Sequence, residues 1–404
     1  MKPVLKVGKL YHILLIFVVT ELVLCGSGQL IKVGGGLTLR MLNYLCIFGF
    51  YLLFIIYGHF KMDRQDWKIF GFYLLSFFFS ASWCLINDNI QNLTEDIKPL
   101  SYFLVFPFFI IAIDSYATIR KISSIIQYGA LVMGTVYLIY LAAIKILGLI
   151  DFVTFYGSMS EQSDIMFREE GGELFYKGFI FLPIGLLFWL KERKIFPICI
   201  ILLAIYFTLT RGFYVIAMLG TAWYVISISK KNLPTLLFWG FCGMAAIFVV
   251  IASGLFEMGE ARSDGDIIRI ITFEQVMANA TPLSVLIGHG FGEGVPIRQI
   301  HMENAFLEIF HKQGLLGLSF WLFLLYNIYF YNKKVVVHKD ISRLYWIGTL
   351  MVYIQSLFNP FLTNPIGMSF VIISYASCRY LSRPGQIIGR KLEFVPSVAR
   401  TVNS

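Results

Sequence analysis

The stretch 288–318 combines residue types and spacings that could support acid–base chemistry. A glycine-rich segment, 288–292, is followed by His301, Glu303 and Asn304. An imidazole is well suited to accept a proton near neutral pH, so we expect His301 to be a general base. Asn304 would share a helix face with His301, where it could orient the ring or bind a sugar hydroxyl. Glu303 is a further candidate for substrate binding. The alternative is a polar, capping stripe at an exposed helix start.

Two arginines upstream are candidates for binding phosphate oxygens. Arg211 lies between two apolar runs, where Gly212 is expected to let a tight turn close, and Arg269 is flanked by isoleucines. A guanidinium can bind a pair of phosphate oxygens through two parallel hydrogen bonds, which an ammonium does less well. The alternatives are a headgroup-contacting arginine for Arg211 and a local ion pair with an aspartate for Arg269. Arg168 is a weaker candidate, because neighbouring carboxylates explain it as a solvated ion pair.

Neither a metal nor a cofactor is indicated by the pattern. The chain lacks an HExxH motif and offers too few ligands near His301, so we expect no metal. The glycine-rich segment follows no predicted strand, which argues against a dinucleotide site. A glycoside hydrolase needs two acids flanking the scissile bond, and Glu303 and Glu308 have no matching pair on the donor side.

The elements that carry these residues are predicted to be transmembrane helices. Hydrophobic residues make up 58% of the 404 and charged residues 14%, with a mean hydropathy of +0.74, whereas soluble domains carry about a quarter charged residues. Apolar runs of about 17–25 residues predict an all-α, polytopic transmembrane bundle of about twelve spans in one domain, 1–404. The predicted spans lie near 10–27, 41–58, 69–87, 101–116, 124–149, 177–190, 195–210, 212–229, 234–255, 304–331, 343–359 and 365–381.

The basic residues are distributed unevenly between the two sides of the predicted bundle. One side collects 22 of the 33 lysines and arginines against five acidic residues. Positively charged loops mark the cytoplasmic side, so both termini are predicted to be cytoplasmic and the long loops 151–176 and 256–303 to lie outside. Apolar residues at helical spacing from Ile267 to Val276 predict a helix at the membrane surface. The net charge of +9 therefore indicates topology and no nucleic-acid partner.

The order of these motifs resembles the bacterial O-antigen polymerase and O-antigen ligase family. The resemblance covers roughly residues 200–365 and rests on a set of short motifs: Thr208-Leu209-Thr210-Arg211-Gly212, Arg269, Pro282, Gly288-x-Gly290-x-Gly292, His301-x-x-Asn304, Gly314-x-x-Gly317-Leu318 and Asn359-Pro360. Many family members have an asparagine directly after the histidine, whereas Met302 and Glu303 intervene here.

The resemblance implies a metal-independent glycosyltransferase of the GT-C type in the bacterial inner membrane. Its substrates would be undecaprenyl-diphosphate-linked oligosaccharides, and its site would face the periplasm with 256–303 as the catalytic loop. Arg211 and Arg269 match the arginines thought to bind the donor diphosphate, and His301 matches the histidine proposed to activate the acceptor. The lipid bilayer, a chain-length regulator and a flippase are the implied partners.

Three functions stay open at this point. A polymerase joining repeat units by direct displacement with inversion is favoured over a ligase that transfers polymer to lipid A-core, because the ligase-like His-Asn pair is absent. A lipid-linked oligosaccharide flippase would also have many spans. It is expected to place charges along an internal cavity, whereas polarity here is concentrated at one face.

Overall fold

Helices make up nearly all of the regular structure in the computed structural model. It describes residues 2–26, 28, 31–34, 37–56, 62–86, 92–152, 155, 165–167, 173–228 and 260–383. The α-helices are α1 (Lys2–Leu24), α2 (Leu39–Ile56), α3 (Arg64–Ile86), α4 (Leu93–Ser101), α5 (Phe106–Ala112), α6 (Tyr116–Lys145), α8 (Phe181–Glu192), α9 (Ile195–Phe207), α10 (Arg211–Ile228), α12 (Glu260–Ala278), α13 (Pro282–Ile287), α14 (Ala305–Lys334), α15 (Lys339–Gln355) and α16 (Pro365–Leu381). The predicted all-α class is confirmed.

Short 3₁₀ turns and two small hairpins complete the described fold. The 3₁₀ turns are η2 (Tyr102–Val105) and η3 (Lys177–Ile180). Strand β1 (Lys32–Gly34) pairs antiparallel with β2 (Leu37–Thr38), and β3 (Ile165–Phe167) pairs antiparallel with β4 (Leu174–Tyr176). The second hairpin leads directly through η3 into α8.

Within the described part of the chain, five helices are long and apolar enough to cross a membrane, namely α2, α3, α6, α10 and α14. Two shorter apolar helical stretches occur there at Leu10–Leu24 and in α9. The chain is therefore a multi-pass membrane protein. The predicted run near 101–116 is not one straight helix, because η2 separates α4 from α5 and prolines occupy positions 99 and 107. The predicted span 234–255 lies outside the described residues, and the number of spans stays a prediction.

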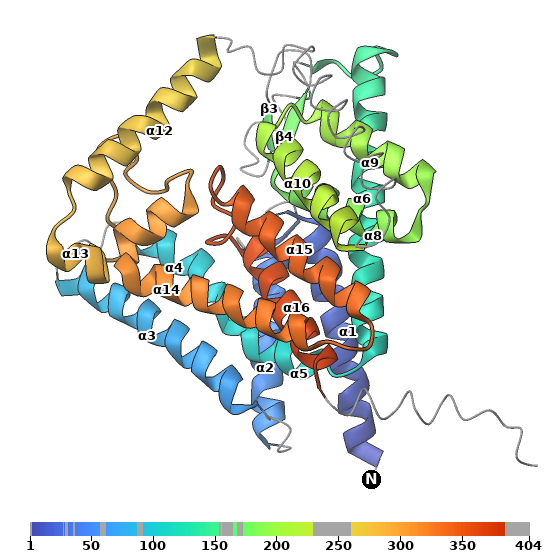
Figure 1. The fold of residues 1–404 in the computed structure, drawn as a ribbon, viewed down its shortest axis with the longest axis horizontal. Coiled ribbons are helices and arrows are strands. Elements are labelled where there is room, and N and C mark those ends of the chain that lie inside the picture. Colours follow the sequence, from blue (N-terminus) through green and yellow to red (C-terminus); the bar gives the residue numbers. More distant parts are fainter. Residues whose placement is uncertain are drawn as a thin grey trace, which may run out of the picture.

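The core of the bundle forms around α14, α15 and α16. Helix α14 packs against α3, α15 and α16, while α6 packs against α1, α8 and α9 (Figure 1). Nearly every residue of α16 is buried, including Ser374 and Ser377. Such a helix is surrounded by protein, so its polar side chains need no contact with lipid.

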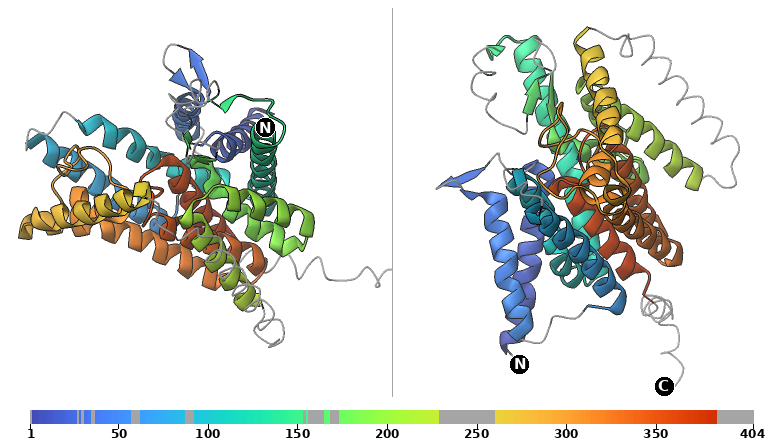
Figure 2. Two further views of the ribbon diagram at one scale, coloured as in Figure 1. Left: turned by 90° about the horizontal axis from the view of Figure 1, so that it is seen from above. Right: turned by 90° about the vertical axis from the view of Figure 1, so that its left-hand side faces the viewer.

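Polar clusters mark the two ends of α3. At its start, Arg379 of α16 donates to Asp63 at 2.6 Å and pairs with Asp66 at 2.5 Å. At its far end, the backbone N–H of Phe291 in the glycine-rich segment donates to Ser80 O at 3.2 Å. The start of α1 and the end of α16 lie at the same end of the bundle (Figure 2). This agrees with the predicted segregation of basic residues, and which end faces the cytoplasm stays a prediction.

The predicted loop 256–303 contains two helices from residue 260 onward. The helix expected from Ile267 to Val276 is confirmed and lies within α12. Its outward side exposes Ile267, Ile270 and Phe273, with 51%, 59% and 54% of each residue's surface accessible. Helix α13 begins with a reciprocal cap in which the Thr281 and Ser284 side chains each accept from the other residue's backbone N–H. Contact of α12 with a membrane surface stays a prediction.

A kink at Gly314 shapes α14. The glycine has φ 62° and ψ −158°, a conformation that a residue with a side chain adopts only with strain. The non-helical turn leaves carbonyl groups without helical partners. Those of His311 and Lys312 accept from the backbone N–H groups of His289 at 2.8 Å and Gly290 at 3.0 Å. The glycine-rich segment therefore serves as a platform that docks on the kink.

Candidate active site

His301 lies in a loop just before α14. The helix begins at Ala305, with Asn304 as its N-cap in extended backbone conformation, so the predicted shared helix face of His301 and Asn304 is wrong. The Asn304 side-chain oxygen accepts from the backbone N–H groups of Phe306 at 2.9 Å and Leu307 at 3.1 Å. This is the capping role of an N-terminal asparagine. A part for Asn304 in substrate binding stays a prediction.

The loop that carries His301 is anchored by its neighbour, Met302. Met302 is buried in a small apolar cluster with Val276 of α12 and Val295. The first N–H group of α14, on Ala305, donates to Ser356 O at the end of α15 at 2.8 Å. Met302 and the N–H of Ala305 therefore fix the loop on either side of His301, one toward α12 and the other toward the end of α15.

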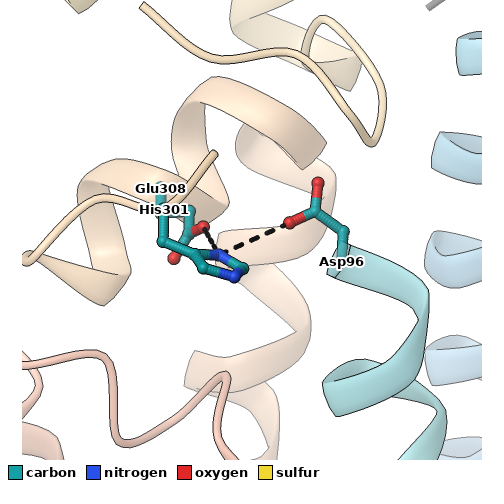
Figure 3. Close-up of side chains that lie close together, drawn as sticks. All are labelled: Asp96, His301 and Glu308. Atoms are coloured by element: carbon teal, nitrogen blue, oxygen red, sulfur yellow. Dashed lines mark hydrogen bonds and ion pairs between the residues drawn. The ribbon is translucent and has the colours of Figure 1, made fainter. Parts of the chain in front are cut away.

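The imidazole of His301 faces two carboxylates. Its Nδ1 lies 3.2 Å from Glu308 Oε1 and 3.8 Å from Asp96 Oδ1 (Figure 3). Both carboxylates are nearly inaccessible, whereas 48% of the His301 side chain is exposed. An ionised carboxylate only accepts hydrogen bonds, so Nδ1 carries the proton and donates to Glu308. This arrangement leaves the lone pair of Nε2 free to accept a proton from a substrate.

Asp96 is a member of the site that sequence reasoning missed. It comes from α4, and its Oδ2 accepts from the backbone N–H of Gly292 at 2.7 Å. Burial raises the pKa of the Asp96 carboxyl, and the nearby Lys312 ammonium opposes this shift. The contact joins α4 to the glycine-rich segment across the bundle, so no local spacing could have revealed it.

Lys312 is the second residue that sequence reasoning missed. Its Nζ donates to Asp96 Oδ1 at 2.7 Å, to Glu308 Oε1 at 2.8 Å and to the Ile300 carbonyl at 2.6 Å. A signal was present, because a lysine inside the predicted span 304–331 is costly and lies one helical turn from Glu308. The neighbouring His311 is buried, with its ring 4.6 Å from that of His289.

The predicted arginines belong to one continuous chain of ion pairs. Arg211 lies 3.6 Å from Asp266, which also pairs with Arg269 at 2.8 Å. Arg269 donates to Glu303 at 2.6 Å, and Glu303 accepts from Arg298 at 2.6 Å. The local ion pair considered for Arg269 is therefore present, together with a second partner. Sequence reasoning gave Arg298 no role, and Arg168 lies outside the described residues.

Arg211 is the first residue of α10 and follows a tight turn after α9. The turn depends on Leu209, whose φ is 49°, and not on Gly212 as expected. Gly212 is helical, and a Cβ there would lie 2.6 Å from the Gln355 side chain of α15. The glycine thus permits close packing of α10 on α15. Among the described residues, Arg211 Nη2 is buried without a hydrogen-bond partner.

A cavity of about 410 Å³ opens in front of His301. Its charged lining residues are Asp96, Lys177, Arg269, Arg298, His301, Glu303, Glu308 and Lys312, and Asn359, Asn364, Phe175 and Phe361 add polar and aromatic surface. A second hollow of about 100 Å³ shares Arg269, Arg298 and Glu303 and adds Ile268, Phe273, Leu307 and Leu357. Arg269 and Arg298 thus line both hollows.

The cluster around His301 also has the spacing of a metal site. Within the described part of the chain, Asp96, His301 and Glu308 offer ligand atoms within 4.8 Å of one another. The expectation that ligands are too few therefore overlooked Asp96. However, the Lys312 ammonium already lies between the two carboxylates, at distances typical of charge-assisted hydrogen bonds. These residues fit an internal cation better than an added one.

The chain is similar to a known protein over most of its length. The chain is 26% identical to an O-antigen polymerase of Shigella flexneri over 370 residues, which is 89% of this chain and 92% of the relative. No protein-family model matches the chain.

The resemblance to the O-antigen polymerases is confirmed.

The residues that carry this resemblance lie together in the structure. Arg269 and His301 line the same cavity, as do Asn359 and Pro360, and Arg211 is joined to Arg269 through Asp266. The Gly314 motif supplies the kink on which the glycine-rich segment rests. Motifs that are far apart in the sequence therefore converge on one cavity.

Proposed function

We propose that the chain is an O-antigen polymerase, a glycosyltransferase that joins undecaprenyl-diphosphate-linked repeat units. The observation that carries the proposal is the convergence of an imidazole, oriented by a buried carboxylate, with two arginines, Arg269 and Arg298, around one cavity. The named relative, which extends over most of the chain, supports the same assignment. Neither a soluble substrate nor a nucleotide is needed to explain the residues of the site.

The proposed reaction is a direct displacement at the anomeric carbon of the donor. His301 Nε2 accepts the proton of the acceptor hydroxyl as the oxygen forms a bond to the anomeric carbon. The bond between that carbon and the diphosphate oxygen breaks, and the diphosphate leaves with the electron pair. Glu308 stabilises the imidazolium through Nδ1, as the aspartate does in a serine-protease triad. One displacement inverts the configuration of the carbon.

The arginine chain is suited to stabilise the leaving diphosphate. Negative charge grows on the diphosphate in the transition state, and guanidinium groups in a partly desolvated cavity stabilise it there. Arg211 and Arg269 are proposed to bind it, with Arg298 beside them. In the structure these arginines are paired with Asp266 and Glu303. A bound diphosphate would therefore displace these carboxylates from the guanidinium groups.

The two hollows suggest how the donor lies. The glycan would enter the larger cavity before His301, with its charged residues, while the smaller hollow would accept the first isoprene units of the lipid against Ile268, Phe273 and Leu307. The diphosphate would then sit between them, at Arg269 and Arg298. This placement brings the anomeric carbon to the side of the cavity that holds His301.

We place the site on the periplasmic face of the bacterial inner membrane, within a GT-C-like bundle of about twelve spans. A flippase would deliver the lipid-linked units, and a chain-length regulator would act with the polymerase. The Lys312 cation between the carboxylates supports a metal-independent reaction.

The lipopolysaccharide of a deletion strain tests the proposed function. Loss of a polymerase leaves lipid A-core that carries a single repeat unit. Loss of a ligase leaves bare core while lipid-linked polymer accumulates, and loss of a flippase leaves bare core without such polymer. We expect a band for core plus one unit on a gel, with the ladder restored by the wild-type gene. Bare core in the deletion strain would contradict the polymerase assignment.

Cysteine labelling tests the proposed orientation. In a variant without the six native cysteines, a membrane-impermeant reagent should label single cysteines placed in 151–176 and 256–300 of intact spheroplasts. Positions in 61–68, 191–194 and 333–340 should react only after permeabilisation. External labelling at position 192 would invert the topology and move the proposed site to the wrong compartment.

A further inference from the structure

Lys312 makes a complete set of contacts inside the bundle. Only 3% of its side chain is accessible, and its ammonium has three N–H groups facing three acceptors, Asp96 Oδ1, Glu308 Oε1 and the Ile300 carbonyl. Every donor of the ammonium is thus used. Because all three N–H groups of Lys312 are occupied, the side chain has no donor left for a substrate. Any effect of Lys312 on the reaction must therefore act through the residues that it binds.

One of these neighbours is the carboxylate that orients the proposed base. Glu308 Oε1 accepts from Lys312 at 2.8 Å and faces His301 Nδ1 at 3.2 Å, so a single oxygen joins the lysine to the imidazole. A glutamate side chain has several rotamers, and ordering it costs conformational entropy. A hydrogen-bonded ammonium four residues further along α14 selects the rotamer that points Oε1 at His301.

The other charged groups around His301 are engaged elsewhere. Arg269 of α12 and Arg298 both bind Glu303, which leaves Asp96 of α4 and Glu308 of α14 to Lys312. Lys177 of η3 also lines the cavity. Lys312 is therefore paired with both of the buried carboxylates that face Nδ1.

We propose that Lys312 is the positioning residue of this site, a permanent internal cation that holds Glu308 against His301 and fixes the imidazole tautomer. The inference rests on the proposed role of His301 as the base. Asp96 has a different task in this account. It balances the lysine charge and fastens the glycine-rich segment through the backbone N–H of Gly292.

Two double variants of equal charge separate positioning from simple charge balance. Lys312→Met with Asp96→Asn, and Lys312→Met with Glu308→Gln, each remove the cation and one carboxylate. The first retains the carboxylate that binds Nδ1, and the amide oxygen introduced at position 96 can still accept from Gly292. In the second, the amide introduced at position 308 can turn its NH₂ group toward Nδ1. Nδ1 would then accept that hydrogen bond, which favours the tautomer with the proton on Nε2. An Asp→Asn change in a serine-protease triad has the same effect.

The rates are measured on purified proteins with a lipid-linked single repeat unit as substrate. We expect the Asp96→Asn double variant, which has balanced charge but has lost the group that holds Glu308, to lose at least about tenfold in turnover rate. The Glu308→Gln double variant, which has also lost the carboxylate, should lose at least about a hundredfold. Both should accumulate to similar levels, with similar KM for the donor. The Lys312→Met single variant, with two uncompensated carboxylates, should be less active than the Asp96→Asn double variant.

Three outcomes would overturn the inference. A wild-type rate in the Asp96→Asn double variant would show that only charge balance matters. A fully active Lys312→Met variant would show that the cation is dispensable. Failure of the Asp96→Asn double variant to accumulate would assign Lys312 to fold stability alone. His301→Ala, run in parallel, tests the base itself: if it is inactive while the Asp96→Asn double variant keeps the wild-type rate, the positioning role fails and the proposed function stands.

Discussion

Replacing His301 with alanine should abolish chain extension while protein levels stay unchanged. The imidazole is the group proposed to take the acceptor proton, and removal of a general base typically costs about 10²–10⁴ in rate. About half of the His301 side chain is exposed, so its loss leaves little unfilled space in the fold. The measurement is the lipopolysaccharide ladder of a deletion strain carrying the variant, together with immunoblots of its membranes.

His12 offers a matched control for this variant. It lies on α1, with its Nε2 2.9 Å from Asp114, and does not line the cavity in front of His301. His12→Ala should therefore retain the ladder. His311 is unsuitable as a control, because its buried ring packs on His289 and its removal would open a cavity. A normal ladder from His301→Ala would leave only substrate-assisted or arginine-dependent catalysis.

Changing Arg211 or Arg269 to lysine should reduce polymer formation strongly, even though the positive charge is retained. A guanidinium reaches two oxygens at once, and a lysine ammonium, which lacks the planar fork, cannot reproduce that geometry. Loss of one well-placed donor to a developing anion costs about 10²–10³ in turnover in known cases. We expect each variant to lose at least about tenfold in turnover rate of the purified protein, with normal expression.

Arg343 is the control for the arginine variants. It lies at the start of α15 and pairs weakly with Asp340 at 4.0 Å, on a different part of the bundle from the cavity. Arg343→Lys should extend chains at the wild-type rate. If the Arg211→Lys and Arg269→Lys variants both matched it, these arginines would not bind the donor diphosphate through paired hydrogen bonds.

Several helices, and two of the three arginines in the chain of ion pairs, could be predicted from the sequence. Hydropathy predicted α16 at its observed bounds, and the helical spacing from Ile267 to Val276 predicted the middle of α12. Both signals are local, because each depends on residues within one or a few turns. Arg211 and Arg269 could be recognised because a charge beside an apolar run is costly to remove from water, which makes such residues candidates for a functional site.

The carboxylate and lysine framework behind His301 could not be derived from the same signals. Asp96 and Lys312 are 216 positions apart, and their contact depends on how α4 packs against α14. The kink at Gly314 decides where the carbonyl of Lys312 points and where the glycine-rich segment docks. These features follow from the arrangement of helices in space, whereas spacing along the chain places residues only within one helix.

The start of α14 shows how a local ambiguity misled the interpretation. His301 and Asn304 have the spacing of neighbours on a helix, yet Asn304 is also a strong N-cap. The capping preference prevailed, and the helix begins at Ala305. His301 therefore lies in a loop, where its side chain can turn toward Glu308. A regular helix that began at residue 301 would not give this geometry.

Extension of a lipid-linked repeat unit by the purified protein tests the central claim most directly. With an undecaprenyl-diphosphate-linked single unit and a metal chelator, the wild-type chain should produce a ladder of longer lipid-linked glycans and release undecaprenyl diphosphate, while His301→Ala should produce neither. A wild-type protein that extends no chains but transfers the glycan to added lipid A-core would contradict the account and identify a ligase.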